Sequence, residues 1–454
     1  MVMLLVLLVA SAAHVGATLN NWSTFPAHTL PKLNGSSYPR YREIFQSGEC
    51  TRADALPNGR QFPLPNGGGT TRIDPNKVCF SCFRIPTLLA GQTVGVVHAF
   101  AEARRGEMRA PGWCPDGPDT RLVYKRSSDS GATWSAASVF LQDPTDRAEN
   151  GLCQSQAAPV IDPVTKTLFV GFTANLPGCQ APALRAKSYK TTPMLVNSTD
   201  DGLHWSKPYK LEHNDVTSAF GPSFGPTKGL AVKTRNRAGV RLLLPGENGW
   251  SAAVFSDDGG ATWQSNALNR SYTLSPGEMD WTICSNGTRC PPGMKFIMVS
   301  RANGGGCSGE TMCAQFSADG LVWSAPVATV NADQLLVGQG HAKPGIVAVP
   351  GAFISSQTLE LCPTGVKMNP DQSCGTPGTP SYRQREPDDV LGSGMCLMIS
   401  IDGVHWSLFK KTWPIGGMYT TAAGLTFDAA GAALTYAIVF AAGRCVALKH
   451  SISF

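Results

Sequence analysis

A short segment with the pattern Ser-x-Asp-x-Gly-x-x-Trp recurs along this chain, three times in full and twice with one residue fewer. In such a segment the Asp side chain accepts hydrogen bonds from main-chain N–H groups of a tight turn, and Gly adopts the positive φ that the turn requires. The Trp begins the next strand and covers the turn with an apolar face. The five copies begin at Ser127, Ser198, Ser256, Ser317 and Ser400.

The spacing of the copies, 58 to 83 residues, suits one four-stranded blade of a β-propeller per copy. The composition agrees, since only 15% of the residues are charged and the 48 Gly and 33 Pro favour strands and turns. The formal net charge of +6 is modest and no basic run occurs, so nucleic acid is not an expected partner. We therefore expect an all-β propeller.

The N-terminal residues 1–17 are predicted to be a signal peptide. An apolar run from Val2 to Ala13 is followed by the small-residue sequence Val15-Gly16-Ala17, which suits cleavage. The alternative is an uncleaved membrane anchor, but the run is shorter than the roughly 20 residues that span a bilayer, and no stable membrane span is expected. We expect entry into the secretory pathway, with an extracellular or lysosomal/vacuolar destination.

The cysteines and glycosylation sequons agree with that route. Fourteen cysteines, an even number, favour disulfide bonds, whereas the Cys79-x-x-Cys82 segment lacks a second such pair or a His cluster for zinc. The preferred bridges are Cys284–Cys290, Cys307–Cys313 and Cys362–Cys374. N-x-Ser/Thr sequons occur at Asn21, Asn34, Asn197, Asn269 and Asn286.

Two segments precede the first full repeat, Phe83-Arg84-Ile85-Pro86 and Ala99-Phe-Ala-Glu102-Ala-Arg104. In their order and spacing they resemble motifs of the sialidase family, in which the Ser-Asp-Gly-Trp repeat is called an Asp-box. The resemblance implies a six-bladed β-propeller of four-stranded antiparallel blades, with residues 78–454 as the catalytic domain. Residues 18–77, which are rich in Pro, Gly and Asn, are expected to form an irregular N-terminal arm.

The chemistry of sialoside hydrolysis explains which residue types to seek. The anomeric carbon of sialic acid carries a carboxylate, which arginine forks bind and which repels a carboxylate nucleophile. A tyrosine activated by a glutamate base avoids that repulsion. The resemblance implies that Arg84 binds the substrate carboxylate, while Arg104 reaches the 4-position side of the sugar with Glu102 beside it.

The resemblance also implies the acid, the base and a second arginine. Asp116 lies nine residues before Lys125 and is the expected general acid, with Asp119 as its competitor on a loop longer than in the animal enzymes. Glu278 stands alone as a glutamate between the third Asp-box and Arg301, so it is the expected base. Arg301 follows an apolar strand-like run and is the expected second carboxylate-binding arginine.

The expected nucleophile and third arginine lie towards the C-terminus. Gly417-Met418-Tyr419 follows the last Asp-box and resembles the family's tyrosine segment, where Gly permits close backbone approach. Arg385 is the preferred third arginine and Arg383 the runner-up. The chain departs from the family near residues 441–442, where alanines replace the glutamate that supports the first arginine.

Together these residues predict a retaining exo-α-sialidase that acts through a covalent sialyl-tyrosine intermediate on sialylated glycans. No metal or organic cofactor is expected. Two alternatives stay open: a trans-sialidase, which passes the same intermediate to another sugar, and a catalytically inactive sialic-acid-binding propeller. The type of sialic acid and the linkage preference have no readable signature in the sequence.

Overall fold

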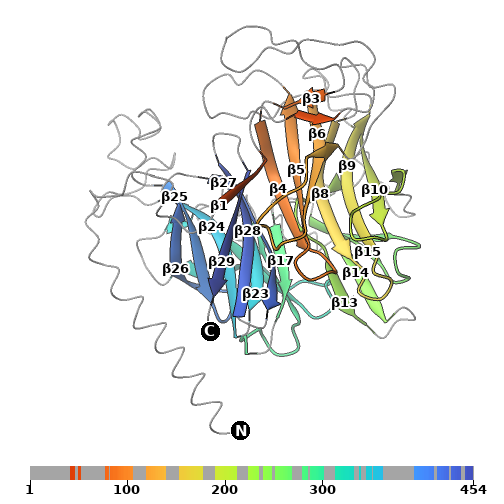
Figure 1. Cartoon of the computed structure of the whole chain (residues 1–454). Coiled ribbons are helices and arrows are strands. Elements are labelled where there is room, and N and C mark those ends of the chain that lie inside the picture. Colours follow the sequence, from red (N-terminus) through yellow and green to blue (C-terminus); the bar gives the residue numbers. More distant parts are fainter. Residues whose placement is uncertain are drawn as a thin grey trace, which may run out of the picture.

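The computed structural model of the protein is built from β-strands (Figure 1). It describes residues 41–45, 50–52, 77–80, 82–105, 119–139, 153–176, 190–211, 223–234, 239–247, 251–267, 279–284, 287–300, 312–331, 337–338, 344–349, 351–360, 393–413, 417–428, 431–440 and 445–452. Among these residues no helix is both long and apolar enough to cross a membrane.

The strands form the following sheets, numbered here in chain order. Sheet 1 contains β4 (Cys82–Ala90), β5 (Val97–Arg105), β6 (Asp119–Ser127) and β7 (Ser138–Val139). Sheet 2 contains β8 (Cys153–Ile161), β9 (Leu168–Leu176), β10 (Lys190–Ser198) and β11 (Tyr209–Lys210). Sheet 3 contains β12 (Ser223–Phe224), β13 (Leu230–Lys233), β14 (Val240–Glu247), β15 (Ser251–Ser256) and β16 (Gln264–Ala267).

The second half of the chain completes the set. Sheet 4 contains β17 (Met279–Ile283), β18 (Phe296–Ser300), β19 (Cys313–Ser317) and β20 (Val327–Ala328). Sheet 5 contains β21 (Val330–Asn331), β22 (Val337–Gly338), β23 (Gly345–Val349), β24 (Ala352–Glu360), β25 (Ser393–Ser400) and β26 (His405–Trp413). Sheet 6 contains β1 (Tyr41–Phe45), β27 (Gly417–Asp428), β28 (Gly431–Phe440) and β29 (Cys445–Ile452), and a ribbon pairs β2 (Cys50–Arg52) with β3 (Lys77–Cys79).

The prediction of an all-β propeller is confirmed, but the prediction of six four-stranded blades is wrong in its count. Five sheets follow a four-stranded path in the described residues, with β13 as an extra strand pairing with β14 in sheet 3. Sheet 5 has six strands. The reason is local: β22 and β23 both pair with β24, and β21 adds to β26 in parallel orientation.

The first and last sheets meet at the closure of the propeller. Strand β27 of sheet 6 lies against β4 of sheet 1, and the early strand β1 pairs antiparallel with β29. The Lys125 ammonium from sheet 1 donates to the carbonyl of Ile44 at 2.5 Å and lies over the Phe45 ring. These contacts tie residues 41–45, a part of the segment 18–77, to both sheets.

The signal peptide lies outside the described residues, and the domain boundaries stay predictions.

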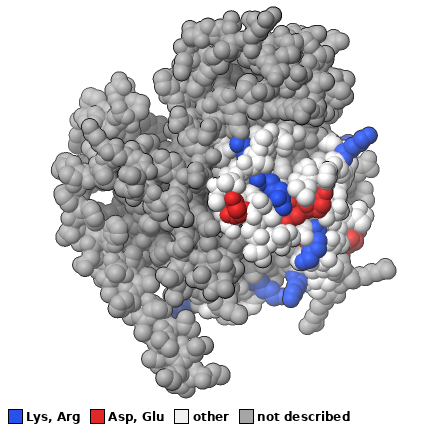
Figure 2. All heavy atoms as spheres, in the orientation of Figure 1, with Lys and Arg blue, Asp and Glu red and all other residues white. Residues whose placement is uncertain are grey.

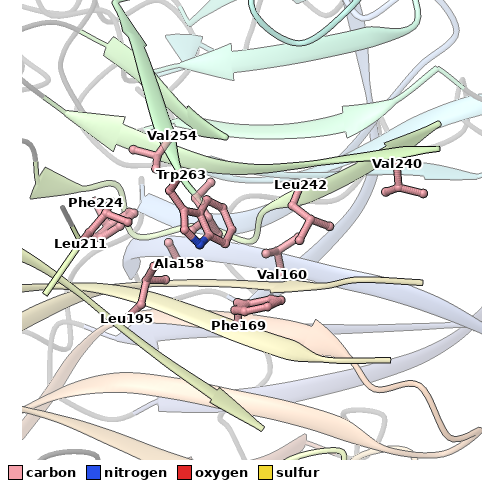
Figure 3. Close-up of a cluster of buried hydrophobic side chains, with 11 residues drawn as sticks. Ala158, Val160, Phe169, Leu195, Leu211, Phe224, Val240, Leu242, Val254 and Trp263 are labelled. Atoms are coloured by element: carbon pink, nitrogen blue, oxygen red, sulfur yellow. The ribbon is translucent and has the colours of Figure 1, made fainter. Parts of the chain in front are cut away.

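The core consists of apolar layers between neighbouring sheets, and Asp-box tryptophans contribute to it. Between sheets 2 and 3, Trp263 of the third Asp-box packs edge-on against Phe169, with ring centroids 5.6 Å apart (Figure 3). Val160 and Leu242 belong to the same buried cluster (Figure 3). Alternate residues of these strands enter the layers because side chains of a β-strand point to opposite faces of its sheet.

Each Asp-box is a hydrogen-bonded turn, as the sequence predicts. In the first, the Ser127 hydroxyl donates to Asp129 Oδ1 at 2.8 Å and accepts from the Gly131 N–H, while Asp129 Oδ1 accepts from the Thr133 N–H. Burial raises the pKa of Asp129, but hydrogen bonds from Thr133 and Ser127 outweigh it and lower the pKa to about 2. The serine and aspartate of the other four boxes are hydrogen-bonded in the same way.

The second Asp-box also joins sheet 2 to sheet 1. Asp201 accepts hydrogen bonds from His98 Nε2 at 3.0 Å and from the Gln92 and Thr93 N–H groups. His98 Nδ1 lies 2.9 Å from the Tyr124 hydroxyl. Burial lowers the pKa of His98, although the hydrogen bond to Asp201 opposes it. In the neutral form of His98 that burial favours, Nε2–H can donate to Asp201 while Nδ1 accepts from the Tyr124 hydroxyl.

Gly202 allows this close approach, and we expect Gly202→Ala to destabilise the protein by about 2–4 kcal/mol. Its φ is +85°, and a Cβ would overlap the Tyr124 hydroxyl oxygen and lie 3.1 Å from His98 Nδ1. Gly239→Ala is the matched control, because its φ is +70° and nothing lies within 4 Å of its Cβ. Urea unfolding of both variants measures the difference. Equal losses of unfolding free energy would show that backbone strain alone requires glycine at Gly202.

One predicted disulfide is confirmed. Cys284 and Cys290 are joined, with an S–S distance of 2.04 Å. Cys313 is also disulfide-bonded, while its predicted partner Cys307 lies outside the described residues. The predicted pair Cys362–Cys374 lies outside them as well.

Candidate active site

The strand directions place three of the predicted site residues, Arg84, Glu102 and Arg104, at one end of sheet 1. One strand of each sheet lies on the inside of the propeller, and these inner strands contact one another in a ring, β4–β8–β13–β17–β23–β27, which closes on β4. In an antiparallel sheet, the start of the first strand and the end of the second lie at the same end. Arg84 stands near the start of β4, and Glu102 and Arg104 near the end of β5. The first Asp-box follows β6, the third strand of sheet 1, and therefore lies at the opposite end of that sheet.

At that end Arg84, Glu102 and Arg104 are brought together. Arg84 and Glu102 are partners in the register of β4 and β5. Arg104 Nη2 donates to Glu102 Oε2 at 2.7 Å, and the two residues are 5% and 3% exposed. Arg84 is 6% exposed. Register partners of an antiparallel pair point to the same face of the sheet, so this face carries two arginines and one carboxylate, a balance that suits an anionic ligand.

Two strained bulges surround this group. Ile85 has a φ of +53° in a bulge of β4, and Gln156 has a φ of +62° in a bulge of the neighbouring strand β8. A positive φ is unusual for a β-branched residue, and such strain concentrates at functional sites. The Thr87 hydroxyl donates to the Ala157 carbonyl at 3.0 Å, and the Gln156 N–H donates to Glu102 Oε1 at 3.2 Å. Hydrogen bonds therefore join the bulge in β4 to sheet 2 and the bulge in β8 to sheet 1.

Sequence reasoning missed Thr87 and Gln156. Thr87 directly follows the Phe-Arg-Ile-Pro segment, a position that could have drawn attention to it. Gln156 has no sequence signal, because only the register of β8 and β9 shows that it occupies a bulge.

Tyr419 is the third residue of β27, where its main chain pairs with Val439. Since β27 lies against β4, the strands that carry Tyr419 and Arg84 are neighbours at the propeller closure. The competitor Asp119 is the first residue of β6, at the same end of sheet 1.

The other predicted residues lie outside the described ones, namely Asp116, Glu278, Arg301, Arg383 and Arg385. The strands next to two of them are nevertheless paired. Met279, which follows Glu278, is the register partner of Ser300, which precedes Arg301. Both predicted residues thus adjoin one end of the β17–β18 pair along the chain.

A buried ion pair that the sequence did not reveal joins the segment between β12 and β13 to the inner strands β17 and β23. Asp280 of β17 accepts from Lys228 Nζ at 2.8 Å on both carboxylate oxygens, and from the Ile346 N–H of β23 at 2.8 Å. The Thr227 hydroxyl donates to Asp280 Oδ1 at 2.5 Å. Asp280 is fully buried and Lys228 is 6% exposed. The pair therefore ties β17 to β23 and to the segment that precedes β13.

Charged residues of both signs lie on the face of the molecule that Figure 2 shows. Near the centre of the described surface in Figure 2, Lys and Arg side chains lie next to Asp and Glu. The described residues contain no group of three or more His, Cys, Asp or Glu side chains placed to hold a metal ion.

A protein-family model and two curated proteins match parts of this chain. A family model described as "BNR repeat-like domain" matches residues 109–355, more than half of the chain. Rat Sialidase-2 is 31% identical over 171 residues, and an exo-alpha-sialidase of Arthroderma benhamiae is 24% identical over 269 residues. These alignments cover 36% and 52% of this chain and span 42% and 54% of the two relatives, so the chain matches about half of their length.

Solved structures share the fold at low sequence identity. The NanB sialidase of Streptococcus pneumoniae aligns with a TM-score of 0.56 at 12% identity, covering 93% of this chain and 73% of that one. An intramolecular trans-sialidase from Ruminococcus gnavus aligns with a TM-score of 0.53 at 14% identity, covering 82% of this chain and 95% of that one.

Proposed function

This chain belongs to the BNR repeat-like domain family, and we propose that it is a retaining exo-α-sialidase acting on terminal sialic acids of glycoconjugates. The observation that carries the proposal is the buried Arg84–Glu102–Arg104 group, flanked by two strained bulges at one end of the propeller. The sequence resemblance to the sialidase family is confirmed by the matches to the rat and fungal proteins.

In the proposed binding step, Arg84, Arg301 and Arg385 hold the substrate carboxylate, and Arg104 contacts the sugar near its 4-position. Arginine suits the first task because its planar fork binds a carboxylate through two hydrogen bonds and stays charged. Glu102 accepts from Arg104 and so fixes the direction of its guanidinium group. Burial strengthens these interactions, because the local dielectric constant is lower than that of water.

In the proposed reaction, Tyr419 attacks the anomeric carbon as Glu278 takes its phenolic proton. The glycosidic C–O bond breaks and Asp116 protonates the leaving oxygen, which leaves a sialyl-tyrosine intermediate. Water then attacks the same carbon with Asp116 as base, the bond to Tyr419 breaks, and Glu278 returns the proton to the tyrosine. Two inversions at the anomeric carbon give net retention.

A trans-sialidase is the second candidate, favoured by the structural likeness to a protein described as an intramolecular trans-sialidase. An inactive sialic-acid-binding propeller is the third, favoured by the alanines at 441–442. We also propose that the chain enters the secretory pathway, as its apolar N-terminal run suggests.

The test is an incubation of the full chain with a fluorogenic α-sialoside, with and without lactose as acceptor. We expect release of the fluorophore and free sialic acid, with the α-anomer as the first product by NMR. Sialyl-lactose or an anhydro sugar as the main product would favour a transferase instead. Binding of sialic acid without any turnover from pH 4 to 8 would sink the enzyme proposal and favour the binding propeller.

A further inference from the structure

A continuous chain of hydrogen bonds runs from sheet 3 through sheet 2 to Arg104 in sheet 1. The Phe224 N–H donates to Thr173 Oγ1 at 2.9 Å, and the Thr173 hydroxyl donates to Gln156 Oε1 at 3.4 Å. The Gln156 N–H donates to Glu102 Oε1 at 3.2 Å, and Glu102 Oε2 accepts from Arg104 Nη2 at 2.7 Å. The β-strands β12, β9, β8 and β5 each contribute to it.

The direction of each hydrogen bond follows from the chemistry of its groups. A main-chain N–H can only donate, so Thr173 Oγ1 accepts from Phe224 and uses its single hydrogen towards Gln156. A side-chain amide oxygen can only accept, which orients the Gln156 amide. Thr173 is 2% exposed and Phe224 is fully buried, so water does not compete for the hydrogen bond between them, while Gln156 is half-buried.

The strained backbone of Gln156 depends on this support. A non-glycine residue with φ of +62° persists only where its surroundings hold it, at a cost of roughly 1–3 kcal/mol. Two contacts hold the bulge: Thr173 binds the Gln156 side chain, and Thr87 donates to the next carbonyl, that of Ala157. At this bulge the Gln156 N–H points to Glu102 and donates to it.

We propose that Thr173 and Gln156 are positioning residues that orient the Arg104 guanidinium, through Glu102, for contact with the substrate. The inference rests on the proposed function, because it assigns to Arg104 a contact with the bound sugar. Thr173 acts through the Gln156 bulge and touches no substrate. Loss of this support is therefore expected to weaken the enzyme's binding of the substrate and of the transition state to the same extent. Such a loss raises KM and leaves kcat nearly unchanged.

The test is Thr173→Val, which keeps the side-chain shape and removes the hydroxyl. We expect KM for a fluorogenic sialoside to rise about 3–10-fold, with kcat within about twofold of wild type. Thr173→Ser restores the hydroxyl and is expected to restore KM. Thr167→Val is the control, since this buried threonine hydrogen-bonds to Thr165 in the turn at the other end of sheet 2.

A second variant, Gln156→Gly, tests the same inference independently of whether Thr173→Val folds. Gln156→Gly keeps the N–H and accepts a positive φ without strain, but lacks the amide that Thr173 holds. We expect a similar rise in KM with no loss of melting temperature. An unchanged KM in Thr173→Val, or a raised KM that serine does not rescue, would overturn the inference. Absence of activity in the wild type would instead reject the proposed function, and with it this role of Arg104.

Discussion

Replacement of Tyr419 by phenylalanine is expected to reduce kcat for a sialoside by about 10³-fold or more. The variant loses the oxygen that forms the bond to the anomeric carbon, so only poorly assisted attack by water remains. Because the change removes one hydroxyl group, the melting temperature and the binding of free sialic acid should stay close to those of the wild type. Steady-state kinetics, thermal unfolding and calorimetric titration measure the three quantities.

The control for this variant is Tyr209→Phe. Tyr209 lies on the outer strand β11 and is 38% exposed, far along sheet 2 from the inner strands. We expect its kcat to equal that of the wild type. If Tyr419→Phe retains more than a tenth of wild-type activity while folded, the tyrosine is not the nucleophile and the proposed intermediate is wrong.

Replacement of Lys228 by methionine is expected to lower the free energy of unfolding by about 3–5 kcal/mol. The change leaves the Asp280 carboxylate buried without its counter-charge, although the Thr227 hydroxyl and the Ile346 N–H still donate to it. Asp280 has no exposed surface, so water cannot take the place of the ammonium group. Urea unfolding at neutral pH measures the loss.

The matched control is Arg241→Met, which breaks another bidentate ion pair. Arg241 Nε and Nη2 donate to Asp257 at 2.8 and 2.7 Å, but Asp257 is a third exposed. We expect a loss of about 1 kcal/mol or less, because solvent screens this pair. The double variant Lys228→Met/Asp280→Asn removes both charges and should recover part of the loss. Equal losses in the two single variants would contradict the role given to burial.

The sequence alone predicted the elements whose physics is local. An Asp-box forms its turn within about eight residues, so Ser127, Asp129 and Gly131 predict their own hydrogen bonds without knowledge of the rest of the chain. The same holds for the Cys284–Cys290 bridge, since six residues of separation keep the thiols close. The predicted arginine and glutamate on β4 and β5 also lie together, because hairpin pairing is set by nearby residues.

Features that depend on contacts between sheets needed the tertiary structure. The prediction of four strands per blade is wrong for sheet 5, where β21 pairs with β26 and both β22 and β23 pair with β24. These pairings depend on which strands are neighbours in the fold, and the spacing of the Asp-boxes does not predict them. Gln156 meets Glu102 across the boundary of sheets 1 and 2, with Thr173 behind it in sheet 2, and no sequence spacing encodes these contacts. The Lys228–Asp280 pair joins residues 52 positions apart.

The sequence by itself therefore determined the repeating turn, the all-β class and the candidate Arg84–Glu102–Arg104 group. The tertiary structure decided how that group is held, through strained bulges and hydrogen bonds from neighbouring sheets. The physical reason is that a turn or hairpin is stabilised by residues close in the chain. Buried polar contacts between sheets, by contrast, form only once the ring of inner strands has closed and excluded water.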